Sequence, residues 1–180
     1  MNPAAANAKD TSIFESRKFR VVQAAIETPD GEIRHTHLIR HPGAVVILPL
    51  LPDDDIVMIR NYRQTLDREL WELPAGTLDQ PGEPPEHAAV RELEEEAGYR
   101  AGHLRRLCDM HPSPGVMDER IIAYVATDLT KTTQQLEPAE QIEVEVVSAD
   151  KAMQMATDGT ITDAKTLVTL FRWNHERRND

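Results

Sequence analysis

The segment from Leu73 to Tyr99 constrains this chain most, because it predicts a strand end, a glycine-containing turn and one acidic helix. Pro84 and Pro85 suit the first turn of a helix, where the N–H that proline lacks would have no helical partner. Gly98 suits the helix end, where a residue with positive φ is favoured. At about 100° per residue, one side of the helix carries an apolar stripe that we expect to face a core. The stripe consists of Ala89, Val90, Leu93 and Ala97.

Carboxylates border this apolar stripe. Glu92 and Glu96 lie four residues apart and therefore stack on the helix, with Glu95 one step further round. Like charges on adjacent turns destabilise an isolated helix by roughly a few tenths of a kcal/mol per pair, so a compensating group is expected. A divalent cation would compensate directly, and a solvated acidic face with Arg91 as a pairing partner is the alternative.

The same segment resembles the Nudix box, Gly-x5-Glu-x7-Arg-Glu-U-x-Glu-Glu-x-Gly-U, where U is a bulky apolar residue. Six residues, from Thr77 to Gly82, precede the first glutamate where the pattern has five, which we interpret as one residue inserted around Gln80 and Pro81. The helical half of the box keeps its register. The matching residues are Gly76, Glu83, Arg91, Glu92, Leu93, Glu95, Glu96, Gly98 and Tyr99.

This resemblance implies a metal-dependent hydrolase. It implies Glu92 and Glu96 as metal ligands, with Glu95 assisting and the carbonyl of Ala75 as a backbone ligand. Carboxylate oxygens without Cys or His in the cluster favour Mg²⁺ or Mn²⁺ over Zn²⁺. Arg91 is expected to orient the carboxylates, and together with Glu95 it counts among the catalytic residues.

A second stretch, Ser113 to Arg120, is similar to a loop of the Nudix ADP-ribose pyrophosphatases. These enzymes carry a proline at about the distance of Pro114 from the box, in a Ser-Pro-Gly loop that leads to a glutamate. The resemblance implies Glu119 as the general base, with Asp118 as second choice. Pro114 and Gly115 are then expected to line the substrate site. An ordinary Pro-Gly turn with exposed acids is the alternative.

Three further residues are predicted to contact substrate. Arg60 and Arg63 belong to a stretch similar to the one that precedes the box strand in this family. A guanidinium suits bidentate contact with phosphate, although a surface arginine on a strand is an equal alternative. Phe19 is a candidate for stacking on adenine, with core packing as the alternative.

The pattern of mixed strands with a few helices predicts an α/β protein. The resemblance implies the Nudix α/β/α sandwich with a mixed sheet and an N-terminal β-hairpin extension. We expect a disordered tail over residues 1–12, the extension over 13–42 and the Nudix domain over 43–180. The hairpin signal is the turn sequence Pro29-Asp30-Gly31. A hairpin is marginal alone, and in the related enzymes this extension helps to form a dimer, so we expect a homodimer.

Composition limits the partners and the compartment. The net charge of −11 repels nucleic acid and anionic membranes, so we expect neither as a partner. No apolar run is long enough to span a bilayer, and the first residues lack the features of a secretory signal. Cys108 is the single cysteine, which is typical of a reducing cytoplasm.

The resemblance implies hydrolysis of ADP-ribose to AMP and ribose 5-phosphate. One alternative is another nucleoside diphosphate sugar, such as GDP-mannose, because no motif here specifies the base or the sugar. A second alternative, of another class, is a sensor that binds a nucleotide sugar without cleaving it.

Overall fold

The centre of the molecule is a mixed sheet whose strands follow the order β7-β4-β10-β9. The sequence of β4 (Ala44–Pro49) is apolar throughout and the strand is fully buried, as a strand covered on both faces must be. It pairs in parallel with β10 (Ile121–Thr127) and antiparallel with β7 (Ala75–Thr77). The antiparallel strand β9 (His103–Met110) completes the sheet. The computed structural model describes residues 10–179.

A second, antiparallel sheet has the order β12-β5-β6. It consists of β5 (Asp55–Arg63), β6 (Arg68–Glu72) and β12 (Ile142–Ser148). A short 3₁₀ helix at Pro52–Asp54 precedes β5, so the run of three aspartates lies in the connection before this strand and at its first residue. A small pair of strands, β8 and β11, spans Tyr99–Arg100 and Thr130–Lys131.

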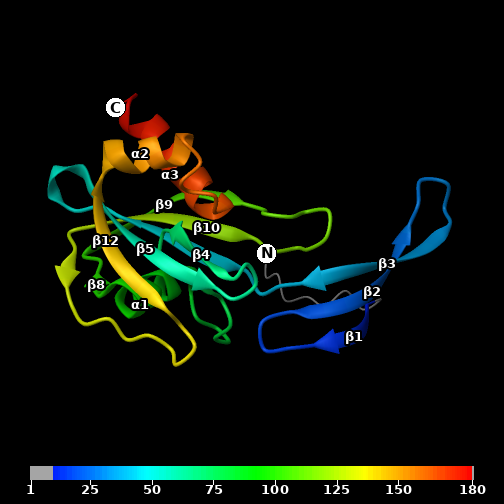
Figure 1. Cartoon of the computed structure of the whole chain (residues 1–180). Helices are drawn as coiled ribbons and strands as arrows, with labels where there is room; N and C mark the ends of the chain where they lie inside the picture. Colours follow the sequence, from blue (N-terminus) through cyan, green and yellow to red (C-terminus); the bar gives the residue numbers. More distant parts are fainter. Residues whose placement is uncertain (1–9, 180) are drawn as a thin grey trace.

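Helices cover both sides of these sheets, with α1 on one side and α2 and α3 on the other (Figure 1). Helix α1 (Pro85–Ala97) begins at the paired prolines and ends at Gly98, which is left-handed with φ of 68°. The side chain of Ser148 caps α2 (Ala149–Thr157). The side chain of Asp163 caps α3 (Ala164–Arg177).

Alternate residues of β4 divide between two cores. Ala44, Val46 and Leu48 pack in the core that includes α2 and α3. Val45 and Ile47 pack in the core that includes α1. The α/β/α sandwich expected from the resemblance is therefore confirmed.

The N-terminal extension is a three-stranded antiparallel sheet that projects away from the sandwich (Figure 1). Its strands are β1 (Thr11–Glu15), β2 (Arg20–Glu27) and β3 (Ile33–Arg40). The β2–β3 hairpin turns at Gly31, with φ of 83°, as predicted. The predicted hairpin is therefore present, and β1 adds a third strand beside β2.

The predicted tail needs a correction. Thr11 and Ser12 belong to β1, where they pair with β2, and Asp10 accepts a hydrogen bond of 2.9 Å from Arg40. The other residues of the predicted tail, 1–9, lie outside the described residues. The apolar stripe of α1 was also placed slightly wrongly. Ala88 is fully buried with Ala89 and Leu93, whereas Val90 is only partly buried, because the stripe is centred one residue earlier. None of the helices within residues 10–179 has the length and apolarity needed to cross a membrane.

Candidate active site

Glu96 is the most deeply buried acid of the acidic helix. Its side chain faces the strand β7, where the backbone N–H of Ala75 donates a hydrogen bond of 2.8 Å to Oε2. Burial raises the pKa of Glu96 to about 8, the bond from Ala75 opposes this, and the charge of Glu92 adds to it. A nearby cation would strongly stabilise the charged form of a carboxyl group whose pKa is raised in this way.

Glu92 packs directly on Gly76 of β7. A Cβ at Gly76 would lie 1.9 Å from Cδ of Glu92 and 2.1 Å from its Oε1, so glycine is needed here for close approach rather than for an unusual φ. Burial raises the pKa of Glu92, with Arg91 opposing the shift. The glycine of the box and the first glutamate of its acidic triplet therefore form one unit, although they lie in different elements.

Arg91 joins the acids of the box to one another. Its guanidinium donates two bonds of 3.1 Å to Glu83, one of 2.7 Å to Glu92 and one of 2.9 Å to Glu95. The bonds to Glu83 are the main cause that raises the pKa of Arg91. The predicted orienting role of Arg91 matches this arrangement.

The inserted residue of the box is absorbed in the turn before α1. Gly82 has a φ of 79°, and the N–H of Glu83 donates to the carbonyl of Gln80. Both oxygens of Glu83 still accept from Arg91, one from Nε and the other from Nη2. The insertion therefore leaves Glu83 in register with Arg91.

The loop before β12 holds the C-terminal end of α1. The N–H of Gln135 donates to the carbonyl of Glu95 at 2.8 Å, and the side-chain amide of Gln134 donates to that of Glu96 at 2.8 Å. The same amide contacts the carbonyl of Ile142 at 3.3 Å. The carbonyls at a helix end have no partner within the helix, so this loop fixes the turn that carries the two glutamates.

Glu140 of the same loop was not among the residues predicted from the sequence. The charge of Glu140 is a minor cause that raises the pKa values of both Glu92 and Glu96, so Glu140 lies near these two acids. In the structure its Oε2 accepts from the N–H of Glu137 at 2.8 Å. The sequence signal, one acid in a proline-containing loop, is too common to single it out.

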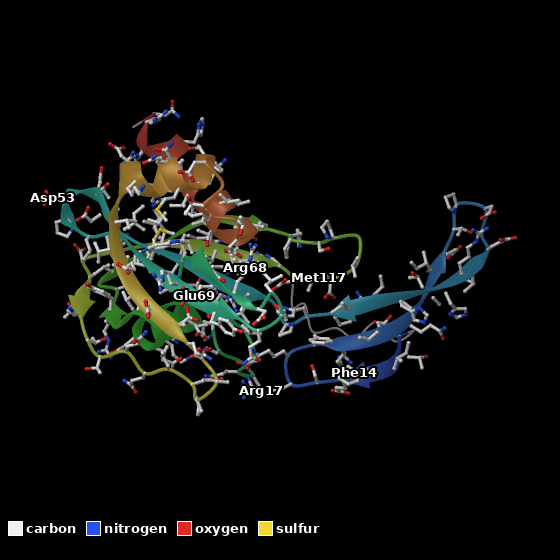
Figure 2. The ribbon with its side chains drawn as sticks, in the orientation of Figure 1. Phe14, Arg17, Asp53, Arg68, Glu69 and Met117 are labelled. Atoms are coloured by element: carbon white, nitrogen blue, oxygen red, sulfur yellow. The ribbon has the colours of Figure 1, made fainter. Side chains whose placement is uncertain are left out.

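The loop with Pro114 and Gly115 is attached to the end of the extension. Both residues are exposed, and the loop is joined to β3 by a bridge between Ile39 and Met117. Met117 marks this junction in Figure 2. The side chain of Glu119 is largely buried, with Oε1 3.5 Å from Nδ1 of His41. The structure thus directs this predicted base toward the junction with the extension.

Asp118, the second choice for the base, ties the same loop to β3. It accepts a bond of 2.8 Å from the N–H of His41 and one of 3.2 Å from Arg40. Both of its oxygens are therefore already engaged in holding the loop.

Arg63 lies beside a buried carboxylate. Its Nε donates to Glu72 at 2.7 Å, and Nη2 donates to the second oxygen, which also accepts from Lys165 at 2.6 Å. The bonds to Glu72 are the main cause that raises the pKa of Arg63, and the charge of Glu96 contributes. Arg63 is thus held near the acidic helix while about 40% of its side chain stays exposed.

The other predicted substrate residues lie apart from the acids of α1. Arg60 forms ion pairs of 3.0 Å with Glu69 and Glu143 on the neighbouring strands. Phe19 is partly exposed, and its ring centroid lies 6.0 Å from that of Phe14. Figure 2 labels Phe14 on the extension. In this single chain, neither residue is brought to the box.

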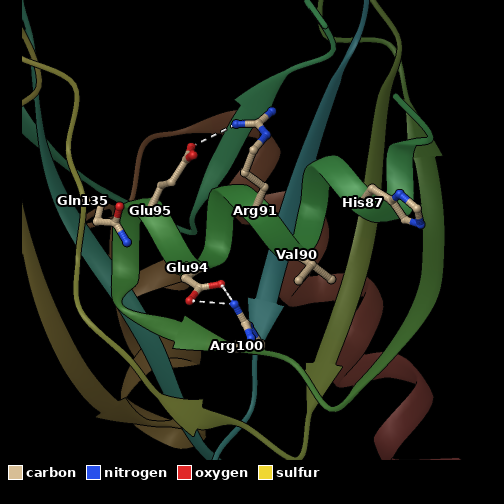
Figure 3. Close-up of a pocket in the computed structure, with 7 residues that line it drawn as sticks. All are labelled: His87, Val90, Arg91, Glu94, Glu95, Arg100 and Gln135. Carbon is tan, nitrogen blue, oxygen red and sulfur yellow. Dashed lines mark hydrogen bonds and ion pairs between the residues drawn. The ribbon is translucent and has the colours of Figure 1, made fainter. Parts of the chain in front are cut away.

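An open pocket of about 470 Å³ lies along the outer side of α1. Figure 3 shows Arg91 and Glu95 paired on one side of it and Glu94 paired with Arg100 on the other. Of the predicted site residues, the pocket shares Arg91 and Glu95. Its lining consists of His87, Val90, Arg91, Glu94, Glu95, Arg100 and Gln135.

The donor chemistry of the box fits a hard divalent cation. Glu92, Glu95 and Glu96 offer carboxylate oxygens, the ligands that Mg²⁺ and Mn²⁺ prefer, and the glycine at position 76 leaves room for a carboxylate against the strand. Within residues 10–179, no three acidic, imidazole or thiol groups already surround one point as metal ligands would. Arg91 and the backbone instead engage the carboxylates of the box.

Comparison with known proteins places this site in a family. A family model described as the NUDIX domain matches residues 40–170. The chain belongs to the Nudix family. It is 34% identical to the ADP-ribose pyrophosphatase of Bacillus subtilis (strain 168) over 156 residues. These residues are 86% of this chain and 84% of that relative.

Other relatives carry other names. The chain is 35% identical over 164 residues to the methanol dehydrogenase activator of Bacillus methanolicus, covering 90% of this chain and 88% of the relative. It is 33% identical over 153 residues to the GDP-mannose pyrophosphatase of Klebsiella pneumoniae subsp. pneumoniae, covering 78% of this chain and 76% of the relative. A solved structure described as an ADP compounds hydrolase shares the fold, with a TM-score of 0.81 at 24% identity over 96% of this chain and 93% of that one. The protein is therefore a Nudix diphosphatase that resembles ADP-ribose pyrophosphatases.

Proposed function

We propose that this Nudix protein hydrolyses the diphosphate bond of ADP-ribose, giving AMP and ribose 5-phosphate. The observation that carries the proposal is the assembly of Glu92 and Glu96 against Gly76 and Ala75 of β7, with Arg91 holding the remaining acids. The similarity to ADP-ribose pyrophosphatases supports the choice of substrate. A relative named for GDP-mannose supports that compound as the second candidate.

The proposed cofactor is Mg²⁺ or Mn²⁺. Glu92, Glu95 and Glu96, with the carbonyl of Ala75, would hold it, since all of these groups are oxygen donors. Such an ion, when bound, neutralises diphosphate charge and makes water a better nucleophile. Arg91 keeps the carboxylates in place through its bonds to Glu92 and Glu95.

In the proposed reaction, the oxygen of water attacks one phosphorus and the bridging P–O bond breaks. The water proton passes to a general base, and two phosphate monoesters leave. Glu119 is the base predicted from the sequence, and Glu140 is a second candidate because its charge acts on both Glu92 and Glu96. Arg63, which is held by Glu72 near Glu96, would contact a phosphate of the substrate.

The test is hydrolysis of ADP-ribose and of GDP-mannose by the full chain with Mg²⁺ or Mn²⁺, with products identified by chromatography and ³¹P NMR. We expect AMP and ribose 5-phosphate at a rate above that for GDP-mannose, and at least 100-fold less product with Glu92→Gln. Faster release of GMP from GDP-mannose would reverse the substrate order. Tight binding of ADP-ribose without cleavage would instead identify a sensor.

We further propose that two copies associate through the extension. Five large apolar side chains of β1–β3 and their loops are between 38% and 56% exposed in the single chain, which is typical of an interaction surface. We expect sedimentation to show a dimer that Phe14→Ser weakens and that Val168→Ser, an exposed apolar position on α3, does not. A monomeric wild-type protein would refute the proposal. The five side chains are Ile13, Phe14, Phe19, Ile26 and Ile33.

A further inference from the structure

The segment that leads into the Nudix box is held at each residue by a different part of the fold. The N–H of Leu73 donates to Oγ1 of Thr166 at 2.9 Å. The carbonyl of Pro74 accepts from Ile47 on β4 at 2.9 Å. The next N–H, that of Ala75, is the donor to Glu96. Three successive residues thus connect the first turn of α3 to the buried acid of α1.

The carboxylate just before this segment belongs to the same connection. Glu72 is 1% exposed and binds both Arg63 and Lys165. Lys165 also contacts the N-cap residue Asp163 at 3.0 Å. The first turn of α3 therefore contacts the chain at Glu72 through Lys165 and at the next residue through Thr166.

Thr166 is fully buried, and its hydroxyl both donates and accepts a hydrogen bond. Oγ1 donates to Asp163 at 2.6 Å and accepts the N–H of Leu73. Asp163 also accepts from the N–H of Thr166 itself, which fixes the hydroxyl at the start of the helix. Because Pro74 restricts φ between Leu73 and Ala75, a shift of Leu73 is passed on to the N–H that binds Glu96.

We propose that Thr166 is a positioning residue of the Nudix site: its hydroxyl fixes the strand that presents the Ala75 N–H to Glu96. Groups that orient a ligand are worth about 10- to 100-fold in metal affinity or activity. The inference rests on the proposed metal-dependent function for its kinetic consequences. Its structural consequence, the position of the strand, does not depend on metal or substrate.

The chain offers a matched control at Thr169. This residue is also fully buried on α3, but its hydroxyl donates within its own helix, to the carbonyl of Lys165. Thr166→Val and Thr169→Val therefore remove the same group from equally buried positions. Thr166→Ser keeps the hydroxyl and serves as the rescue variant.

Three measurements separate positioning from stability. The first is hydrogen exchange of the peptide covering Leu73 to Thr77 in metal-free protein, followed by mass spectrometry. The second is Mn²⁺ affinity, measured by electron paramagnetic resonance without substrate. The third is kcat and KM for ADP-ribose, measured well below the Tm of every variant.

We expect Thr166→Val to speed exchange in this peptide, to weaken Mn²⁺ binding and to lower kcat, the last two by roughly 10-fold. Thr166→Ser should stay within about 2-fold of wild type, and so should Thr169→Val, even where its Tm falls. Equal effects of the two valine variants, or a change in Tm alone for Thr166→Val, would overturn the proposal. If the wild type does not cleave ADP-ribose, the proposed function fails, and the exchange measurement still decides the role of Thr166.

Discussion

Substituting Gly76 by alanine tests the packing between the box turn and the acidic helix. The added Cβ would lie 1.9 Å from Cδ and 2.3 Å from Cγ of Glu92, whereas carbon atoms in contact are about 3.5–4.0 Å apart. The carboxyl group must therefore move by roughly 1.5–2 Å. The φ of Gly76 lies outside the left-handed region, so alanine introduces no backbone strain there.

Glu92 has to absorb this displacement, because both backbones are fixed. Gly76 pairs with Val45 of the central sheet, and α1 is packed on its core. Overpacking of this kind costs about 1–3 kcal/mol of stability. A displacement of about 1 Å at a reacting site lowers turnover by about 100-fold. We therefore expect Gly76→Ala to lower the free energy of unfolding modestly and turnover severely.

The assay is a double-mutant cycle with Glu92→Ala, using urea unfolding for stability and ADP-ribose cleavage for turnover. Without the Glu92 carboxyl, the alanine at position 76 meets no clash, so its cost in stability should vanish and turnover should remain low. The coupling energy should equal the overpacking cost, about 1–3 kcal/mol. A Gly76→Ala protein with wild-type turnover, or a stability loss that persists in the Glu92→Ala background, would refute the reasoning.

Three other predictions concern the same site. Because the folded pKa of Glu96 is about 8 and its ordinary value is 4.5, the acid contributes stability below pH 4.5 that is lost as the pH rises through 8. At about 1.4 kcal/mol per pH unit the loss is at most about 5 kcal/mol; urea unfolding of metal-free Glu96→Gln should show this part of the pH dependence removed, and an unchanged pH profile would contradict it. The kcat values of Glu140→Gln and Glu119→Gln should be compared at saturating metal. Substituting the residue that acts as the base should lower kcat by at least about 100-fold. A change in KM with kcat unchanged would instead make that residue a binding group. Gly98→Ala should destabilise the protein by about 1–2 kcal/mol, since φ is +68° and a Cβ would lie 3.1 Å from the N of Gln134; thermal unfolding at wild-type Tm would disprove this.

Local sequence was sufficient for the acidic helix and the β2–β3 hairpin. Paired prolines at a helix start, Gly98 at its end and a glycine in a hairpin turn act through the backbone of their own residues, so their effect is visible without the fold. The same local rules brought Glu92, Glu95 and Arg91 together, since a helix determines which residues share a face.

The tertiary structure decided how buried each acid is and what it contacts. The pKa of Glu96 depends on burial against β7, and the roles of Glu140 and Thr166 depend on segments that meet only after the chain folds. The separation of Leu73 and Thr166 in sequence, 93 residues, leaves no periodic or capping signal. Periodicity predicted which side of α1 is buried, and only packing against the sheet decided that Ala88 rather than Val90 lies at its centre.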